Sequence, residues 1–341
     1  MSAPTLTPAP APAGAPGPAS GPSLPRRLAS TPEAGVILAC VLAFVVFALS
    51  APTYHNTANL QVMGRDLAQF GILAIGESFV ILTGGIDLSV GGLAGLSGIL
   101  VGWLSVTHGI PAPLAILLTL LICAGIGYWH GAMVSRLNIP PFVITLVTFT
   151  ICKGLSLSIT SGTPITGLSN VFGDLSLYYV GPVPIPALIF VGVALAAWFA
   201  LERTYVGRQI YAVGGNLEAA RLAGIPVARR RTTAYVTSSV LAGIVGMLII
   251  GRMGVADPSI AGTGYELTAI AAAVVGGVSL FGGEGRILGI ASGAILLELI
   301  NGGLLSLKVS SYYQTVAQGV VLGVAVIADG VRAKYFGSGR N

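Results

Sequence analysis

The chain has 341 residues, of which 54% are hydrophobic and only 9% are charged, and its mean hydropathy is +0.87. Soluble domains usually carry about 25% charged residues, so this composition excludes a water-soluble globule with a polar surface. The formal net charge of +5 would suit a nucleic-acid binder. The basic residues, however, are confined to the stretches between apolar runs, which is typical of membrane proteins and argues against nucleic acid as a partner.

The first 25 residues are rich in Pro, Ala, Gly and Ser, and they contain eight prolines and no charged side chain. Such a segment cannot bury a core. We predict a disordered tail over residues 1–30, followed by one transmembrane domain over residues 31–335. Arg26 and Arg27 precede the first apolar run, 35–51, as in a signal peptide. Because many apolar runs follow, we interpret this one as an uncleaved first span.

Apolar runs of about 20 residues, the length that crosses a bilayer core as a helix, recur along the chain. They are continuously apolar rather than alternating, which favours helices over a barrel. The predicted fold is therefore an all-α membrane protein. Its transmembrane helices, about ten in number, are expected at residues 34–52, 59–83, 88–107, 111–134, 141–160, 185–202, 232–252, 266–283, 287–306 and 312–331.

The distribution of Lys and Arg predicts the orientation of these spans. With the N-terminus in the cytoplasm, 13 of the 17 basic residues lie on the cytoplasmic side, and the exceptions are Arg65, Lys153, Arg252 and Lys308. Cytoplasmic loops of membrane proteins carry an excess of Lys and Arg. We therefore predict that both termini are cytoplasmic. The longest outer connection is then residues 161–184, which contain no Lys or Arg.

Residues 83–92, Thr-Gly-Gly-Ile-Asp-Leu-Ser-Val-Gly-Gly, interrupt the apolar pattern near the inner end of the second span. Non-helical backbone at this depth is tolerated only when it is buried in protein or lines a cavity, and an unpaired Asp87 would cost about 2.5–3.5 kcal/mol. One interpretation is that Asp87 caps the next helix through the backbone N–H of Ser89 or Val90. The other, compatible with it, is a gate on a translocation path, formed by Gly84, Gly85, Asp87, Ser89, Gly91 and Glu77.

An internal echo accompanies this segment. Residues 85–92 resemble residues 277–283, Gly-Val-Ser-Leu-Phe-Gly-Gly, and each segment lies between an inward-running span and the span that returns. Internal repeats are common in transporters. The echo therefore favours a transporter, although Gly-rich apolar sequence matches itself easily.

Glu77, Glu298 and Glu266 are candidate functional acids in or at the ends of predicted spans. Glu77 is inside the second span and Glu298 inside the ninth, and a buried acid in a span is a functional hypothesis by default. A proton-coupled carrier would use such groups, but no buried His joins them, so hydrogen bonding between helices is the favoured interpretation. Tyr265 and Glu266 begin the eighth span on its outer side, where Glu266 suits the helix dipole and both residues fit an outer vestibule.

A basic island at residues 203–231 contains six arginines and one short predicted helix. Asn216 is a good N-cap, and Glu218 suits the positive end of the helix dipole. Gly224 closes the helix, and Pro226 prevents its continuation. A helix of about seven residues is too short to be stable alone. It therefore packs either on the membrane surface, with arginines on lipid headgroups, or in a groove on a cytosolic partner.

Sequence signatures of enzymes do not occur in the chain. There is no GxxxxGKS/T phosphate loop, no HExxH and no GxSxG motif. The three cysteines lack CxxC spacing and a neighbouring His. We therefore predict no catalytic residue, no metal site and no cofactor bound by this chain, so that any motor must lie in another protein.

Four stretches together resemble a known family. They begin at Ile81 (ILTGGIDLSVG), Gly207 (GRQIYAVGGNLEAARLAGI), Gly262 (GTGYELTAIAAAVVGG) and Val309 (VSSYYQ). In combination they resemble permease subunits of ABC importers of the ribose, xylose and galactose type, over about residues 55–331. Thr268 and Glu284 depart from the family pattern, which often has an acidic and a basic residue there.

The resemblance implies a permease subunit, with 31–335 as its permease domain, that translocates a sugar or related small polar solute across the bacterial plasma (inner) membrane by alternating access. It implies a cytosolic ATPase subunit that binds ATP and Mg, an extracytoplasmic substrate-binding protein and a second permease copy, besides membrane lipids. In such permeases a cytosolic segment, here within 203–231, docks on the ATPase. This role carries over onto Asn216, Glu218, Ala219, Ala220, Arg221 and Gly224.

Two other functions stay open at the level of sequence. One is a proton-coupled secondary transporter that uses Glu77 and Glu298. The other is a membrane scaffold or receptor component that transports nothing. In none of the three would the chain itself be an enzyme.

Overall fold

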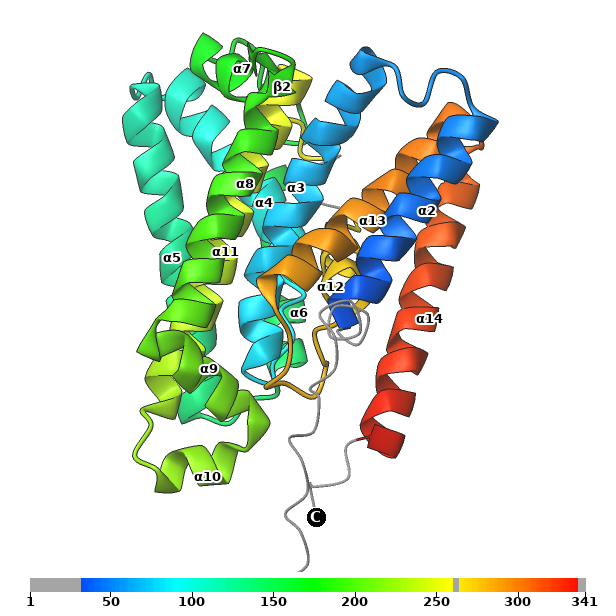
Figure 1. The fold of residues 1–341 in the computed structure, drawn as a ribbon. Coiled ribbons are helices and arrows are strands. Elements are labelled where there is room, and N and C mark those ends of the chain that lie inside the picture. Colours follow the sequence, from blue (N-terminus) through cyan, green and yellow to red (C-terminus); the bar gives the residue numbers. More distant parts are fainter. Residues whose placement is uncertain (1–31, 260–263, 337–341) are drawn as a thin grey trace, which may run out of the picture.

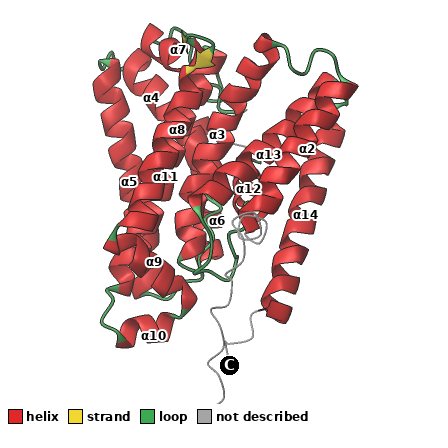
Figure 2. Cartoon of the chain, in the orientation of Figure 1, coloured by secondary structure: helices red, strands yellow, loops and turns green. Residues whose placement is uncertain are grey.

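A computed structural model describes residues 32–259 and 264–336 of the protein. The secondary structure of this part is helical apart from one short hairpin (Figure 2). The all-α fold class agrees with the prediction. The predicted N-terminal tail, residues 1–30, and the first residues of the stretch that begins at Gly262 lie outside the described residues.

Thirteen α-helices and one hairpin follow each other along the described chain. The strands β1 (Tyr179–Val180) and β2 (Val183–Pro184) pair antiparallel. Two π-helical turns, Trp103–Thr107 and Phe199–Arg203, continue α4 and α8. The helices are α2 (Pro32–Ser50), α3 (Thr57–Leu82), α4 (Val90–Gly102), α5 (Ala112–Arg136), α6 (Pro141–Thr160), α7 (Asn170–Leu177), α8 (Ile185–Trp198), α9 (Tyr205–Gly215), α10 (Leu217–Leu222), α11 (Val227–Met253), α12 (Tyr265–Val275), α13 (Ile287–Ser306) and α14 (Ser311–Phe336).

Eight helices of the described chain are long and apolar enough to cross a membrane, two fewer than the ten predicted. The first exception is α3, which fills the predicted span 59–83 but carries Arg65, Asp66 and Glu77. The second is the predicted span 266–283, which is wrong over residues 276–283 because α12 ends at Val275. Gly277 then adopts a left-handed backbone conformation (φ +89°), and a loop leads on to α13.

Helices α3 and α11 lie at the centre of the bundle. The helix α11 packs against α5, α4 and α3, and α3 packs in addition against α12, α13 and α8. The helices α2 and α14 lie at the edge of the bundle (Figure 1), and of their apolar membrane-length stretches 6% and 0% of the residues are buried. Because an exposed apolar surface of this extent marks contact with a membrane or a partner, these outer helices fit the lipid of a bilayer.

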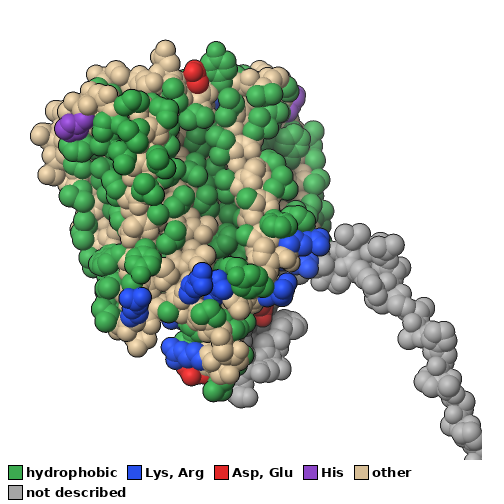
Figure 3. All heavy atoms as spheres, turned by 90° about the vertical axis from the view of Figure 1, so that its left-hand side faces the viewer, with side chains coloured by type: hydrophobic (Ala, Val, Ile, Leu, Met, Phe, Trp, Pro, Cys, Tyr) green, Lys and Arg blue, Asp and Glu red, His purple; other side chains and the backbone are tan. Residues whose placement is uncertain are grey.

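The two ends of the bundle differ. Figure 1 shows α10 at one end, together with the beginning of α2 and the end of α14, and it shows α7 and the hairpin at the other. Figure 3 shows Lys and Arg side chains gathered near the α10 end, with hydrophobic side chains over most of the face above them. The described ends of the chain therefore share one side. That this side faces the cytoplasm stays a prediction from the charge distribution.

The predicted outer connection 161–184 contains structure that the sequence reading did not anticipate. Ser169 caps α7 by accepting a hydrogen bond from the backbone N–H of Val171. Phe172 of α7 is fully buried, and the hydroxyl of Ser176 donates to the carbonyl of Leu248 on α11 at 3.0 Å. The connection is thus packed against the outer part of the bundle.

Candidate functional site

The predicted short helix in the basic island is present as α10. The side chain of Asn216 accepts a hydrogen bond from the backbone N–H of Ala219 at 2.9 Å, as expected of an N-cap. Arg221 and Glu218 form an exposed ion pair at 2.7 Å. Gly224 has φ +74°, a left-handed conformation that ends the helix. Local signals in the sequence therefore determine both ends of α10.

One face of α10 is attached to the protein and the other is not. Ala220 is buried in a small apolar cluster with Val213 of α9 and Val227 of α11. Leu222, by contrast, is 90% exposed. A leucine this exposed on a helix held at the tip of the molecule is available to a partner surface.

The sequence reading missed α9, which precedes α10 and connects it to the bundle. Thr204 caps α9 by accepting a hydrogen bond from the backbone N–H of Gly207. Gln209 of α9 accepts a hydrogen bond from Arg230 of α11 at 2.6 Å. The signal for the start of α9 was Thr204, because threonine is a good N-cap: its side-chain oxygen can accept a hydrogen bond from a backbone N–H in the first turn. The sequence shows no clear break between the two helices, because α9 begins at Tyr205, directly after the helical turn that continues α8 to Arg203.

Three glycine-containing loops meet where α9 ends. The backbone N–H of Gly283, in the loop after α12, donates to the carbonyl of Leu82 at the end of α3, at 3.1 Å. Gly214, at the end of α9, lies so close that a Cβ atom there would be 1.9 Å from the same carbonyl oxygen. We call Leu82, Gly84, Gly214, Gly282 and Gly283 the glycine junction. It brings the second echo segment, residues 277–283, into backbone contact with Leu82 and Gly84, which lie just before the first echo segment.

A buried polar cluster lies between α3 and α4. One oxygen of Asp87 accepts hydrogen bonds from the backbone N–H and hydroxyl of Ser89, and the other accepts from the hydroxyl of Ser238 on α11 at 3.0 Å. Glu77 accepts a hydrogen bond from the backbone N–H of Asp87 at 3.0 Å. Asp87 therefore bonds one of the two backbone donors expected for a cap, and it also joins α11 to the segment 83–89.

The cluster brings most of the predicted gate residues together. Glu77, Asp87 and Ser89 are fully buried and connected by the hydrogen bonds above. Gly84 (φ +78°) and Gly85 form the turn before them, whereas Gly91 lies inside α4. Further buried polar atoms without a hydrogen-bond partner are the second carboxylate oxygen of Glu77, the hydroxyls of Tyr235 and Ser239, and Nδ1 of His130. His130 is fully buried, with Nε2 2.7 Å from the hydroxyl of Thr148 and its ring against Tyr235, so the expectation that no histidine is buried with the acids is wrong.

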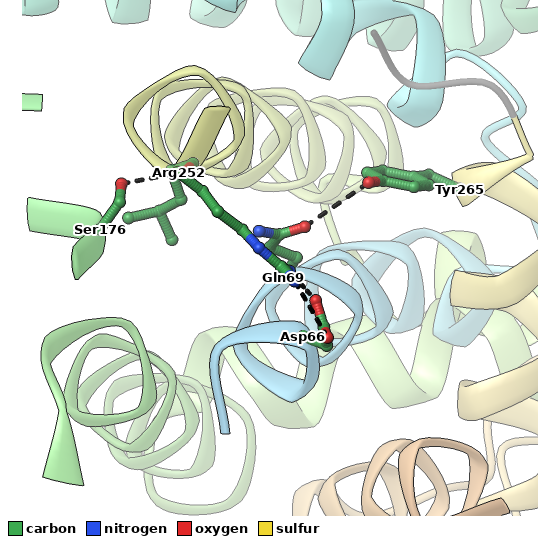
Figure 4. A network of polar contacts seen from close by, with 6 residues as sticks. Asp66, Gln69, Ser176, Arg252 and Tyr265 are labelled. Atoms are coloured by element: carbon green, nitrogen blue, oxygen red, sulfur yellow. Dashed lines mark hydrogen bonds and ion pairs between the residues drawn. The ribbon is translucent and has the colours of Figure 1, made fainter. Parts of the chain in front are cut away.

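A second polar cluster lies in the outer half of the bundle, and Figure 4 shows it. Arg252 reaches from α11 to Asp66 on α3 and forms an ion pair with it. The hydroxyl of Tyr265 on α12 points at the side-chain oxygen of Gln69 on α3, at 3.5 Å. These contacts tie α3 to α11 and α12 across the outer part of the protein.

Tyr265 thus belongs to this outer network, while its predicted companion Glu266 does not bond to the residues drawn in Figure 4. One oxygen of Glu266 is buried and without a hydrogen-bond partner, and the same holds for Glu298 on α13. Sequence reading missed Asp66, Gln69 and Arg252. The available signal was the Arg65–Asp66 pair inside a predicted span, where charges are rare and functional.

The contacts of Glu77 and Asp87 described above are hydrogen bonds with backbone N–H groups and serine hydroxyls. No hydrogen bond among the described residues joins Glu77 on α3 to Glu298 on α13. Within that part of the chain, no three His, Cys, Asp or Glu side chains are placed to hold a metal ion. What the two clusters offer instead is a set of polar contacts, inner and outer, along the helices α3, α11 and α12.

Comparison with known proteins gives consistent matches over most of the chain. A family model described as branched-chain amino acid transport system / permease component matches residues 65–328. The ribose import permease protein of Bacillus subtilis (strain 168) is 39% identical over 300 residues, 87% of this chain and 92% of that protein. The D-allose and xylose transport system permease proteins of Escherichia coli (strain K12) are 36% and 30% identical, and each match covers 91% of the relative. No solved structure matches.

Proposed function

The chain belongs to the family described as branched-chain amino acid transport system / permease component, and from this premise we propose that it conducts a sugar across the bacterial inner membrane. As a member of this family it is a multi-pass permease subunit and not itself an ATPase. The recognition of this family from sequence is therefore confirmed. What we propose in addition is the identity of the sugar, the partner proteins and the residues that contact them.

The proposed substrate is a monosaccharide. The relatives are named for ribose, D-allose and xylose, and the matches cover at least nine-tenths of each of these proteins. These three sugars share neutral charge and many hydroxyl groups. Hydroxyl groups are bound by side chains that both donate and accept hydrogen bonds, as Gln69 and Tyr265 can in the outer network.

The proposed partner at the α10 end is a cytosolic ATP-binding-cassette subunit, which would bind the ATP and Mg. The observation that carries this proposal is the single exposed leucine, Leu222, on a capped helix that the bundle holds at its tip. Asn216, Glu218, Ala219, Arg221 and Gly224 would shape this helix for docking. A substrate-binding protein on the opposite side and a second permease copy complete the proposed importer.

The proposed path follows α3, α11 and α12, and alternating access would open its two ends in turn. The glycine junction connects the end of α9 to the end of α3 and to the loop between α12 and α13 through backbone contacts. A displacement of α10 by the ATPase would therefore reach the inner cluster around Asp87 directly. At the outer side, the Asp66–Arg252 pair would hold the path closed in this arrangement.

The proton-coupled alternative would need Glu77 and Glu298 to act together, and no hydrogen bond among the described residues joins them. His130 is nevertheless buried near Asp87, within the same inner cluster. One oxygen of Glu77 is already bonded to the backbone of Asp87, and Glu298 lies on a different helix. A scaffold without transport is disfavoured because the family and the relatives are described as transport and import permeases.

The docking role is tested with the variant Glu218→Arg/Gly224→Pro in membranes that also contain the ATPase encoded alongside. Proline cannot adopt the left-handed conformation of Gly224, so the turn that ends α10 should be lost. The change at Glu218 reverses the charge in the first turn of the same helix. We expect the ATPase to stop co-purifying and uptake of the sugar to stop. Survival of both would show that α10 is not the docking helix. The matched control Glu284→Arg/Gly215→Ala changes the same kind of charge in a loop outside α10.

A further inference from the structure

A groove of about 650 Å³ runs between α5 and α11 near the α10 end of the bundle. One wall is the face of α5 from Tyr128 to Arg136, and the other is the face of α11 from Val227 to Thr237. The helices touch closely here, because a Cβ atom on Gly131 would lie 2.3 Å from the Cα atom of α11's Thr232. The groove lies beside this contact and outside the proposed path.

The end of the groove nearest α10 is cationic. Arg136 and Arg229 are exposed there, and none of the lining residues is acidic. The ion pairs of the described residues include neither arginine. Ser135, which also lines the groove, has a buried hydroxyl oxygen without a hydrogen-bond partner. The groove therefore offers two guanidinium groups and a hydroxyl to an anion that the chain does not itself supply.

The remainder of the groove is mostly apolar and extends towards the middle of the bundle; Thr232, Thr233 and Thr237 also line it, and the hydroxyls of Thr233 and Thr237 are bonded to carbonyls of their own helix. Arg136 and Tyr128 are separated by eight residues of α5, which is about 12 Å along a helix. Ala132 and Val236 line this stretch, and Tyr128 is exposed beside them. The occupant should therefore combine an anionic group at one end with an apolar chain above it.

We infer that this groove binds an anionic phospholipid from the membrane leaflet on the α10 side. The phosphodiester group accepts hydrogen bonds from Arg136 and Arg229, and an acyl chain lies against Ala132 and Val236. The same order, cationic below and apolar above, holds for the face of the molecule in Figure 3. A soluble phosphate would satisfy the arginines but would make no contact with the apolar wall.

The bound lipid touches the segment that joins α10 to α11. Pro226 and Val227 line the groove, and Val227 packs with Ala220 of α10 in one apolar cluster. A lipid in the groove therefore supports α10 from its C-terminal side. This connects the lipid composition of the membrane to the rigidity of the proposed docking helix.

The test is native mass spectrometry of the purified full-length chain in detergent, with phosphatidylglycerol or phosphatidylcholine of identical acyl chains added. We expect preferential binding of phosphatidylglycerol. The variant Arg136→Gln/Arg229→Gln should weaken this binding roughly tenfold or more, since each arginine near an anionic lipid contributes about 1 kcal/mol. The matched control Arg208→Gln/Arg286→Gln removes two charges from a different pocket, which also contains acidic residues, and should bind as the unaltered chain does.

A second variant tests the shape of the groove without altering charge. Ala132→Phe fills the apolar wall and should also lower phosphatidylglycerol binding, with an unchanged elution volume in size-exclusion chromatography as the control for folding. Equal binding of the two lipids, or undiminished binding in both groove variants, would overturn the inference. Displacement of the lipid by inorganic phosphate would overturn it as well, because it would assign the groove to a soluble anion.

Discussion

The backbone N–H of Gly283 donates a hydrogen bond to the carbonyl oxygen of Leu82 at 3.1 Å, which joins the loop after α12 to the end of α3. Gly214 of α9 packs against the same carbonyl. The segment leading into α10 is therefore in backbone contact with the end of α3 and with the loop between α12 and α13. Backbone contacts cannot be relieved by a change of rotamer, so the junction should transmit displacement rather than absorb it.

The first prediction concerns two adjacent glycines at this junction. A methyl group added in Gly214→Ala would meet the Leu82 carbonyl oxygen at 1.9 Å, so the backbones must separate. We expect the free energy of unfolding to fall by roughly 1–3 kcal/mol or more, and ATP-driven uptake to fall with it. Gly215→Ala is the matched control, because nothing lies within 4 Å of its Cβ position. Thermal unfolding in detergent should separate the two variants; equal melting temperatures would contradict the close contact.

The second prediction concerns the cap of α10. Asn216→Ala removes the acceptor for the backbone N–H of Ala219, which should destabilise the helix by about 1 kcal/mol. We expect faster hydrogen exchange of the α10 amides and weaker retention of the ATPase. Asn216→Asp keeps an acceptor and adds a favourable negative charge, so it should behave as the unaltered chain. Unchanged exchange in Asn216→Ala would mean that packing of Ala220, rather than the cap, holds α10.

This helix could be predicted from sequence because its signals are local. Asn216, Gly224 and Pro226 mark its ends within one short stretch, and the structure places it between those marks. The outer network could not be predicted in the same way. Asp66 and Arg252 are 186 residues apart in the chain, and each alone resembles an isolated charge near the end of a span.

The end of α12 shows a different limit of sequence reading. Val278, Leu280 and Phe281 are as apolar as the helix before them, so hydropathy extends the predicted span to residue 283. The pair Gly276-Gly277 was the signal for the loop, since Gly277 adopts a positive φ that other residues avoid. Glycines are also frequent inside membrane helices, so the presence of two glycines at 276 and 277 did not by itself mark the end of α12.

The third prediction separates an ATP-driven permease from a proton-coupled carrier. Glu77→Gln keeps an oxygen that accepts from the backbone N–H of Asp87 but cannot carry a proton. We expect this variant to retain ATP-dependent uptake. Glu77→Leu leaves the buried N–H unsatisfied, which should destabilise the protein by about 1–3 kcal/mol. Uptake into vesicles, with ATP or with a pH gradient alone, is the measurement. Loss of uptake in Glu77→Gln with normal folding would favour the proton carrier.

The fourth prediction concerns the outer ion pair. Arg252→Met leaves the carboxylate of Asp66 without its partner. The two side chains are 33% and 21% exposed, so we expect a loss of about 1–3 kcal/mol, less than for a fully buried pair. Adding Asp66→Asn should recover part of this loss, because the uncompensated charge is then removed. A double-mutant cycle of unfolding free energies measures the interaction. Strictly additive effects would mean that the pair contributes nothing to holding α3 against α11.

The fifth prediction uses the pH dependence of a tyrosine at the α10 end. The hydroxyl of Tyr211 donates to the carbonyl of Gly285 at 2.9 Å. Burial raises the pKa of Tyr211 to about 12, with a further increase from Glu202 and a smaller decrease from Arg286. Because this pKa is higher in the folded protein than the ordinary value of about 10, its contribution to stability is complete below pH 10 and is lost as the pH rises towards 12.

Tyr211→Phe removes both the hydrogen bond and the titration. At neutral pH it should lower the free energy of unfolding by about 1 kcal/mol, and this difference from the unaltered chain should shrink above pH 10. Tyr205→Phe is the matched control in the same helix, because Tyr205 is 61% exposed and should show no such difference at any pH. Thermal unfolding between pH 7 and pH 11 measures both. A difference that persists undiminished at high pH would show that Tyr211 acts through its packing in the α9 segment and not through its proton.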